Sequence, residues 1–107
     1  MPRSRRVHFD CLTAMRALGE PTRFALVRSL LGGPRCVNDL CEELSATPYN
    51  ASKHLRVLRE AGLIEVEKHS QQRVYSLAEA FRARMKPGTQ TLDLGCCQFH
   101  LDQFEEE

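Results

Sequence analysis

Residues 35–77 have the sequence RCVNDLCEELSATPYNASKHLRVLREAGLIEVEKHSQQRVYSL, in which the apolar pattern changes period half-way. The first part predicts a short helix whose inward face comprises Val37, Leu40, Cys41 and Leu44. Thr47 and Pro48 are typical of a helix cap followed by proline at the first helical position. A second helix should therefore run from there to about Ala61, where Gly62 ends it.

A strand and its return follow this capped helix. Residues 63–68 alternate between apolar and polar side chains, which is the period of a strand. Residues 69–72 are polar and turn-like, and residues 73–76 can return as a second strand. The sequence therefore predicts a β-hairpin directly after the capped helix.

Two more helices are expected before residue 35, one ending at Gly19 and one beginning at Pro21. Their apolar faces comprise Phe9, Leu12, Met15 and Leu18 in the first helix, and Phe24, Val27, Leu30 and Leu31 in the second. A last helix is expected over residues 77–85. Helix, helix, short helix, capped helix and hairpin is the order of a winged helix-turn-helix. The predicted fold class is mainly α, with about five helices and a two-stranded wing.

The 107 residues suffice for one small domain, for which a dimer is a reasonable expectation. Lys86-Pro87-Gly88-Thr89 is a strong break in the pattern. We therefore assign residues 1–86 to the winged-helix domain and residues 87–107 to a cysteine-containing tail. The tail should pack on the domain or on a dimer partner.

Charge is unevenly distributed although the formal net charge is only +1. Residues 1–28 contain six Arg and two acidic residues, whereas residues 93–107 contain five acidic residues and no Lys or Arg. A basic footprint for nucleic acid must therefore be local, and the acidic tail must lie away from DNA phosphates.

Several classes of protein are disfavoured. No apolar run approaches the roughly 18 residues of a membrane span, and the basic N-terminus has no apolar core typical of a secretory signal. The five cysteines are therefore interpreted as thiols of a cytoplasmic protein. The sequence contains no recognisable nucleophile–base set, glycine-rich phosphate loop or pair of catalytic carboxylates, so we do not expect an enzyme.

The capped helix and the hairpin carry the candidate DNA contacts. Outward positions of the helix are Tyr49, Asn50, Ser52, Lys53, Arg56 and Arg59, and the wing tip includes Lys68, His69, Gln71, Gln72 and Arg73. Asn can pair with adenine, Lys and Arg with guanine or phosphate, and Ser with either. A helix N-terminus also favours phosphate.

A specific resemblance to a known family rests on three segments: LGEPTR (18–23), SKHLRVLREAGLI (52–64) and RVYSL (73–77). Together with the rest of residues 12–77 they resemble the ArsR/SmtB-type repressors. The resemblance implies a homodimeric winged-helix protein that binds double-stranded operator DNA and is released by an inducer, often a metal or metalloid ion. By position it implies a recognition helix from Thr47 to Glu60, with DNA-facing residues Thr47, Tyr49, Asn50, Ser52, Lys53 and Arg56. His54 and Leu55 match the usual His-Leu pair, and His54 is interpreted at least equally as a structural residue.

The chain departs from this family at the third helix. Arsenic sensors of the family commonly have a Cys-Val-Cys-x-x-Cys run, but here Asn38 takes the place of the middle cysteine between Cys36 and Cys41. The two remaining cysteines are about 140° apart around a helix. Cys41 is also in phase with the buried leucines, so the usual three-thiolate site is not favoured here.

The vicinal pair Cys96–Cys97 is the preferred ligand site. Its thiolates suit As(III) or another thiophilic ion, with Cys11 or His100 as a possible third ligand. With His100, and with or without Asp102, the pair could instead bind zinc. The alternative is structural, with the cysteines filling an apolar strap that comprises Leu92, Leu94, Phe99 and Leu101.

The last helix is short compared with the long C-terminal dimer helix of many family members. Either the first helix makes more of the dimer contact, or residues 90–101 pack on the partner subunit. A ligand at Cys96–Cys97 would in the second case lie beside the dimer interface.

Three kinds of function remain open at this point. The first is a repressor released by a thiol-binding inducer. The second is a redox-responsive repressor, in which Cys96 and Cys97, or one of them with Cys11, oxidise reversibly. The third is a winged helix used only for protein contact, or an enzyme built on that fold.

Overall fold

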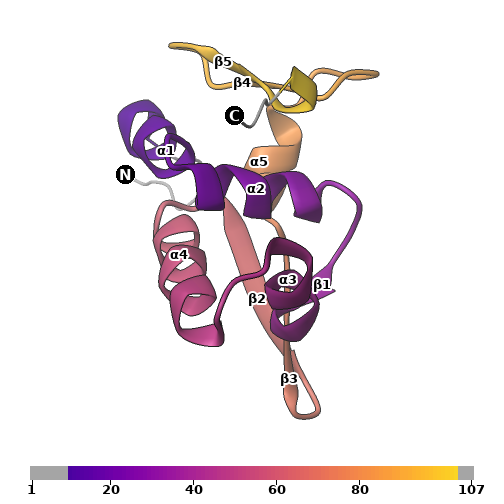
Figure 1. Ribbon diagram of the computed structural model, residues 1–107. Helices are drawn as coiled ribbons and strands as arrows, with labels where there is room; N and C mark the ends of the chain where they lie inside the picture. Colours follow the sequence, from indigo (N-terminus) through magenta and orange to yellow (C-terminus); the bar gives the residue numbers. More distant parts are fainter. Residues whose placement is uncertain (1–9, 104–107) are drawn as a thin grey trace, which may run out of the picture.

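The computed structural model describes residues 10–103 (Figure 1). The elements, in chain order, are α1 (Cys11–Leu18), α2 (Pro21–Leu30), β1 (Arg35–Cys36), α3 (Val37–Leu44), α4 (Pro48–Glu60), β2 (Ile64–His69), β3 (Gln72–Leu77), α5 (Glu79–Ala83), β4 (Thr91–Asp93), β5 (Gln98–His100) and the 3-10 turn η1 (Leu101–Gln103). This is the predicted winged helix-turn-helix, with five α-helices over residues 10–103. Phe9, the N-terminal arginines and the three final glutamates lie outside the described residues.

The starts of three helices are set by side-chain caps. Asp10 accepts a hydrogen bond from the Thr13 amide at 3.1 Å and begins α1. Glu20 accepts one from the Arg23 amide at 2.8 Å and begins α2. Thr47 begins α4, as its sequence predicts. Each cap satisfies an amide that the first helical turn leaves without a partner.

The wing is an antiparallel sheet in the order β1-β3-β2. β2 and β3 pair from Ile64 opposite Leu77 to His69 opposite Gln72, so the predicted hairpin is confirmed. Ser70 occupies the left-handed region (φ 62°) at the turn. β1 was not predicted, because a strand of two residues has no measurable alternation; it adds Arg35 and Cys36 to the free edge of β3.

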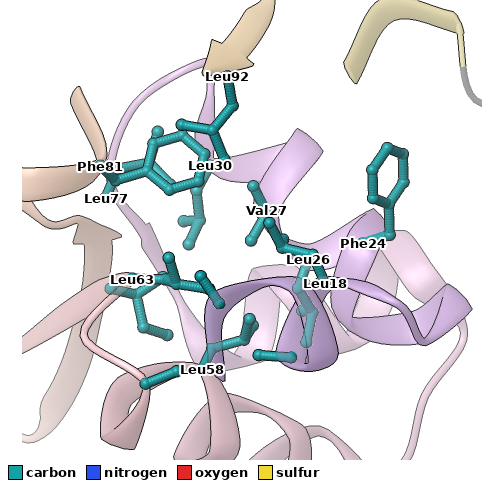
Figure 2. Packing of buried hydrophobic residues seen from close by; sticks show 14 of the residues in the cluster. Leu18, Phe24, Leu26, Val27, Leu30, Leu58, Leu63, Leu77, Phe81 and Leu92 are labelled. Carbon is teal, nitrogen blue, oxygen red and sulfur yellow. The ribbon is translucent and has the colours of Figure 1, made fainter. Parts of the chain in front are cut away.

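Buried leucines, with phenylalanines from α2 and α5, form the core beneath the helices (Figure 2). Ala51, Leu55 and Leu58 of α4 are buried as predicted. The expected apolar face of α1 is wrong at Leu12, which is 63% exposed. Leu18 is buried as predicted, and Ala14 and Ala17 are buried in place of Leu12, since small alanine side chains let α1 lie close to its neighbours. Leu26 is a core residue that the helical pattern missed.

The C-terminal region packs against its own chain. α5 is shorter than the expected helix over residues 77–85, because Leu77 completes β3 and Met85 forms a β-bridge with Leu92. β4 and β5 then form a second hairpin, which lies over α1 and α2 on the side away from the wing (Figure 1). Leu92 and Leu101 are fully buried in the same cluster as the leucines of the helices.

Phe99 of β5 also contacts Phe24 of α2, with 6.2 Å between ring centroids. The hairpin therefore closes one end of the core. Within residues 10–103, no helix has both the length and the apolar character needed to cross a membrane.

Candidate DNA-contact surface and thiol site

The N-terminal half of α4 presents a polar face to solvent. Thr47 Oγ1 accepts a hydrogen bond from the Asn50 amide at 3.2 Å, which fixes the first turn. All six residues that the resemblance assigns to DNA contact are exposed: Thr47, Tyr49, Asn50, Ser52, Lys53 and Arg56. The opposite face of the same helix is buried, so α4 is anchored by one side and free to contact a ligand with the other.

Two pairs on α4 hold long side chains in place. Lys53 Nζ lies 5.4 Å from the centroid of the Tyr49 ring, a cation–π arrangement, and Tyr49 itself is 73% exposed. One turn further on, Arg56 Nε donates to Glu60 Oε2 at 3.2 Å. Lys53 therefore presents its charge in the N-terminal half of α4. The charge of Arg56 is partly balanced by Glu60.

The wing adds a second exposed strip. Gln72 and Arg73 at the start of β3 are exposed, and Arg73 lies opposite Lys68 of β2 in the register. His69 and Glu67 form a contact of 2.8 Å between Nε2 and Oε1. Lys68 and Arg73 thus form a local basic pair near the tip of the wing, although the formal net charge of the chain is only +1.

His54 does not share the outward face of α4. It is half-buried, and Arg23 Nη1 lies 3.2 Å from its Nδ1. Arg23 also donates from Nε to the Ala17 carbonyl at 2.7 Å. Sequence reasoning missed Arg23, although it lies within the LGEPTR segment that carries the family resemblance.

The structure separates the two members of the vicinal cysteine pair. Cys96 is exposed and forms a disulfide with Cys11 at the start of α1, with 6.4 Å between their Cα atoms. Gly95, at φ 93°, supplies the bend before Cys96. Cys97 is a free thiol, half-buried against the core. The arrangement brings Cys11 and Cys96 together and directs the Cys97 side chain toward the core.

The other candidate ligands are His100, Asp102, Cys36 and Cys41. His100 Nδ1 is 3.2 Å from Thr91 Oγ1, and Asp102 is exposed in η1. Cys36 and Cys41 are free, half-buried thiols. Across residues 10–103, no three His, Cys, Asp or Glu side chains are grouped as a metal site. Among the described residues, the structure therefore brings two of the candidate sulfurs together, Cys11 and Cys96, and joins them in a disulfide.

Comparison with known proteins shows that the winged helix-turn-helix of this chain is similar to those of transcriptional regulators. A family model described as "Bacterial regulatory protein, arsR family" matches residues 20–66. The HTH-type transcriptional repressor SmtB of Mycobacterium tuberculosis is 35% identical over 65 residues, which are 61% of this chain and 48% of SmtB. The chain thus spans about half the length of SmtB.

Solved structures agree with this result. A crystal structure described as a possible transcriptional regulator for arsenical resistance is 39% identical, with a TM-score of 0.61, and the match covers 63% of this chain and 70% of that chain. The homodimeric winged helix-turn-helix DNA-binding domain Mb0332 of Mycobacterium bovis is 25% identical, with a TM-score of 0.64 and 68% coverage of both chains. These relatives are described as regulators, not as enzymes.

The residues matched by the family model extend from the cap of α2 into β2 and so contain the whole helix-turn-helix. The chain belongs to the ArsR/SmtB family of bacterial regulatory proteins.

Proposed function

We propose that the chain is a homodimeric repressor that binds double-stranded operator DNA and is released when a thiophilic inducer, most simply As(III), binds its cysteines. The observation that carries the DNA-binding part is α4 itself. Its buried face is locked into the core, whereas its capped N-terminal half and the neighbouring wing expose residues that can contact bases and phosphates.

The proposed contacts follow from the geometry of a helix in the major groove. Asn50 and Ser52 lie near the N-terminus of α4, where recognition helices contact base edges. Lys53, held over Tyr49, can reach guanine or phosphate. Gln72 and Arg73 in the wing can contact the backbone or the minor groove. A DNA partner also requires the cytoplasmic location that the sequence predicts.

A dimer would present two copies of α4 to two half-sites one helical turn apart, about 34 Å. The description of Mb0332 as homodimeric supports this assembly. In the present chain, the space beside α1 and α2 is taken by the β4–β5 hairpin of the same chain. The dimer contact would therefore include the hairpin as well as α1.

The cysteines fit a soft ion in part. The sulfurs of Cys11 and Cys96 are brought together, and reduced thiolates are the ligands that As(III) prefers. Cys97, the neighbour in sequence, would have to turn from its half-buried position to add a third thiolate. When bound, the ion would supply strong bonds to sulfur that tie the start of α1 to the C-terminal hairpin. The relative described for arsenical resistance supports As(III) over zinc.

Fluorescence anisotropy of labelled DNA from upstream of the gene tests the proposal, using fully reduced protein titrated with arsenite. We expect salt-dependent binding that arsenite weakens at least tenfold, about 1.4 kcal/mol. Cys96→Ser should abolish the response and Cys97→Ser should reduce it. Cys36→Ser and Cys41→Ser are matched controls that should retain it. Arsenite release that persists in Cys96→Ser would contradict the proposed site, and absence of DNA binding would contradict the proposed function.

The Cys11–Cys96 disulfide favours a second candidate, a redox-responsive repressor. Two thiols would lose two protons and two electrons to a small-molecule disulfide such as glutathione disulfide, which is reduced to two thiols. Cys97 is free in this state, so Cys97→Ser separates the candidates. Release by glutathione disulfide with chelator present, unchanged in Cys97→Ser and lost in Cys11→Ser, would establish the redox alternative.

A further inference from the structure

We infer that Arg23 is a positioning residue that couples the Cys11–Cys96 site to the recognition helix α4 by linking the last turn of α1 to His54. The inference rests on the proposed function only for the effect of this coupling on DNA.

Arg23 joins three elements through separate atoms. Its Nε donates to the carbonyl oxygen of Ala17 in α1 at 2.7 Å, and its Nη1 lies 3.2 Å from Nδ1 of His54 in α4. Its own backbone is in the first turn of α2. A guanidinium group is rigid and planar, so its two donors keep a fixed relative orientation. A shift of the Ala17 carbonyl is therefore transferred to His54.

The hydrogen bond to His54 has a defined direction. Arginine has donors and no acceptor, so Nδ1 of His54 must accept and the ring proton lies on Nε2. Glu20 holds the Arg23 backbone in the first turn of α2, because its Oε1 accepts from the Arg23 amide at 2.8 Å.

The packing around the bridge leaves room for α4 to respond. A hollow of about 270 Å³ lies between α1 and α4, lined in part by Ala17, Arg23, Val57 and Ala61. A wider groove of about 1200 Å³ reaches His54 from the side of α2 and α3. Side chains next to unfilled space lose fewer contacts when a helix tilts than close-packed side chains do. The Arg23 bridge therefore lies at the edge of the α1–α4 contact, beside this hollow.

Cys11 and Ala17 lie at opposite ends of the same helix. α1 has eight residues and is therefore about 12 Å long, with hydrogen bonds along its length. Joining Cys11 to Cys96, or binding an ion between them, fixes the start of α1 against the C-terminal hairpin. Because a short helix moves as a rigid body, this change alters the position of the Ala17 carbonyl and so the hold of Arg23 on His54.

The anchoring of α4 does not depend on this bridge. Leu55 and Leu58 are fully buried and fix the helix to the core. A partly exposed hydrogen bond contributes little to net stability by comparison. Loss of Arg23 should therefore leave the fold in place and remove the communication between α1 and α4.

The experiment follows backbone amide shifts of α4 by ¹H–¹⁵N NMR in the full chain, reduced and then oxidised with glutathione disulfide. Cys11→Ser, which cannot close the disulfide, identifies shifts caused by other thiols. In the wild type, we expect closure to move amides of residues 50–58. Arg23→Gln and His54→Phe should each lose at least half of that change. Arg16→Gln is the matched control, since Arg16 is an exposed arginine of α1 beside the same hollow, and it should retain the change.

The inference is overturned if wild-type α4 does not respond to closure, or if Arg23→Gln and His54→Phe respond as the wild type does. DNA affinity is measured on the same samples. Arg23→Gln should reduce the fold difference between the Kd of the oxidised protein and the Kd of the reduced protein at least threefold. Arg16→Gln should leave this fold difference unchanged. If the NMR coupling is present but no form binds DNA, the proposed function fails and the inference stands.

Discussion

The Thr47 side chain caps α4 and lies on the surface that we propose contacts DNA. Its hydroxyl oxygen accepts from the Asn50 amide and begins α4, and the same residue is exposed at the end of the helix that would meet DNA. The local sequence is sufficient for the first role, since a Thr-Pro pair is a strong helix start in any fold. The second role needs the rest of α4 to be held in the right direction.

Thr47→Ala should lower the free energy of unfolding by about 1 kcal/mol, because the Asn50 amide loses its acceptor. Thr47→Ser keeps the hydroxyl and should stay close to the wild type. Urea denaturation of the three proteins at one concentration checks this. Equal stability of the alanine and wild-type proteins would show that the cap contributes nothing.

Lys53 illustrates how one charged residue can be tested for its predicted DNA contact. Lys53→Ala should weaken DNA binding at all sequences and reduce the slope of log K against log salt concentration by about 1, since one phosphate contact is lost. Lys86→Ala removes the same charge from the turn between α5 and β4, at the hairpin end of the molecule (Figure 1). The control should bind as the wild type does. An unchanged slope in Lys53→Ala would exclude the phosphate contact.

At the scale of elements, the β4–β5 hairpin is the main departure from a simple winged helix. Residues 91–94 alternate between polar and apolar side chains, but this local pattern does not indicate where the segment packs. The structure shows Leu92 and Leu101 within the common core and Phe99 against Phe24 of α2. The hairpin is therefore as much a part of the core as a helix is.

Leu92→Ala and Leu58→Ala offer a direct comparison, because both leucines are fully buried, one in the hairpin and one in α4. Each substitution should cost about 2–5 kcal/mol through lost burial and the cavity that remains. Urea denaturation monitored by circular dichroism gives both values. If Leu92→Ala lowers the free energy of unfolding much less than Leu58→Ala does, the hairpin does not contribute to the core as this packing predicts.

At the scale of the whole molecule, the Cys11–Cys96 bond connects residues 85 positions apart and so joins the first described helix to the C-terminal hairpin. A cross-link over such a long loop restricts the unfolded chain strongly. The oxidised protein should therefore be more stable than the reduced protein by about 2–4 kcal/mol. Cys11→Ser should abolish this difference.

Cys97→Ser is the control for that prediction, since Cys97 is a free thiol in the disulfide form. It should retain the full difference between the oxidised and reduced proteins in parallel urea titrations. A difference that survives in Cys11→Ser, or disappears in Cys97→Ser, would assign the cross-link to another pair of cysteines.

The sequence by itself determined the order of helices, the capped α4 with its buried and exposed faces, and the β2–β3 hairpin of the wing. These features depend on local signals: helical spacing of leucines, a Thr-Pro start, glycine stops and a change from the period of a helix to that of a strand. The same signals predicted which α4 residues are exposed, because the two faces of an amphipathic helix follow from its spacing alone.

Only the tertiary structure decided which cysteine meets which, which face of α1 is buried, and how α1 is linked to α4. Cys96 and Cys97 are neighbours in sequence, yet a bend at Gly95 sends one to Cys11 and the other toward the core. Leu12 is exposed because the small side chains of Ala14 and Ala17 fit the close approach of α1 to its neighbours better than the Leu12 side chain does. Arg23 meets His54 across 31 positions. Contacts between residues far apart in the chain depend on how whole elements pack, and no local pattern carries that information.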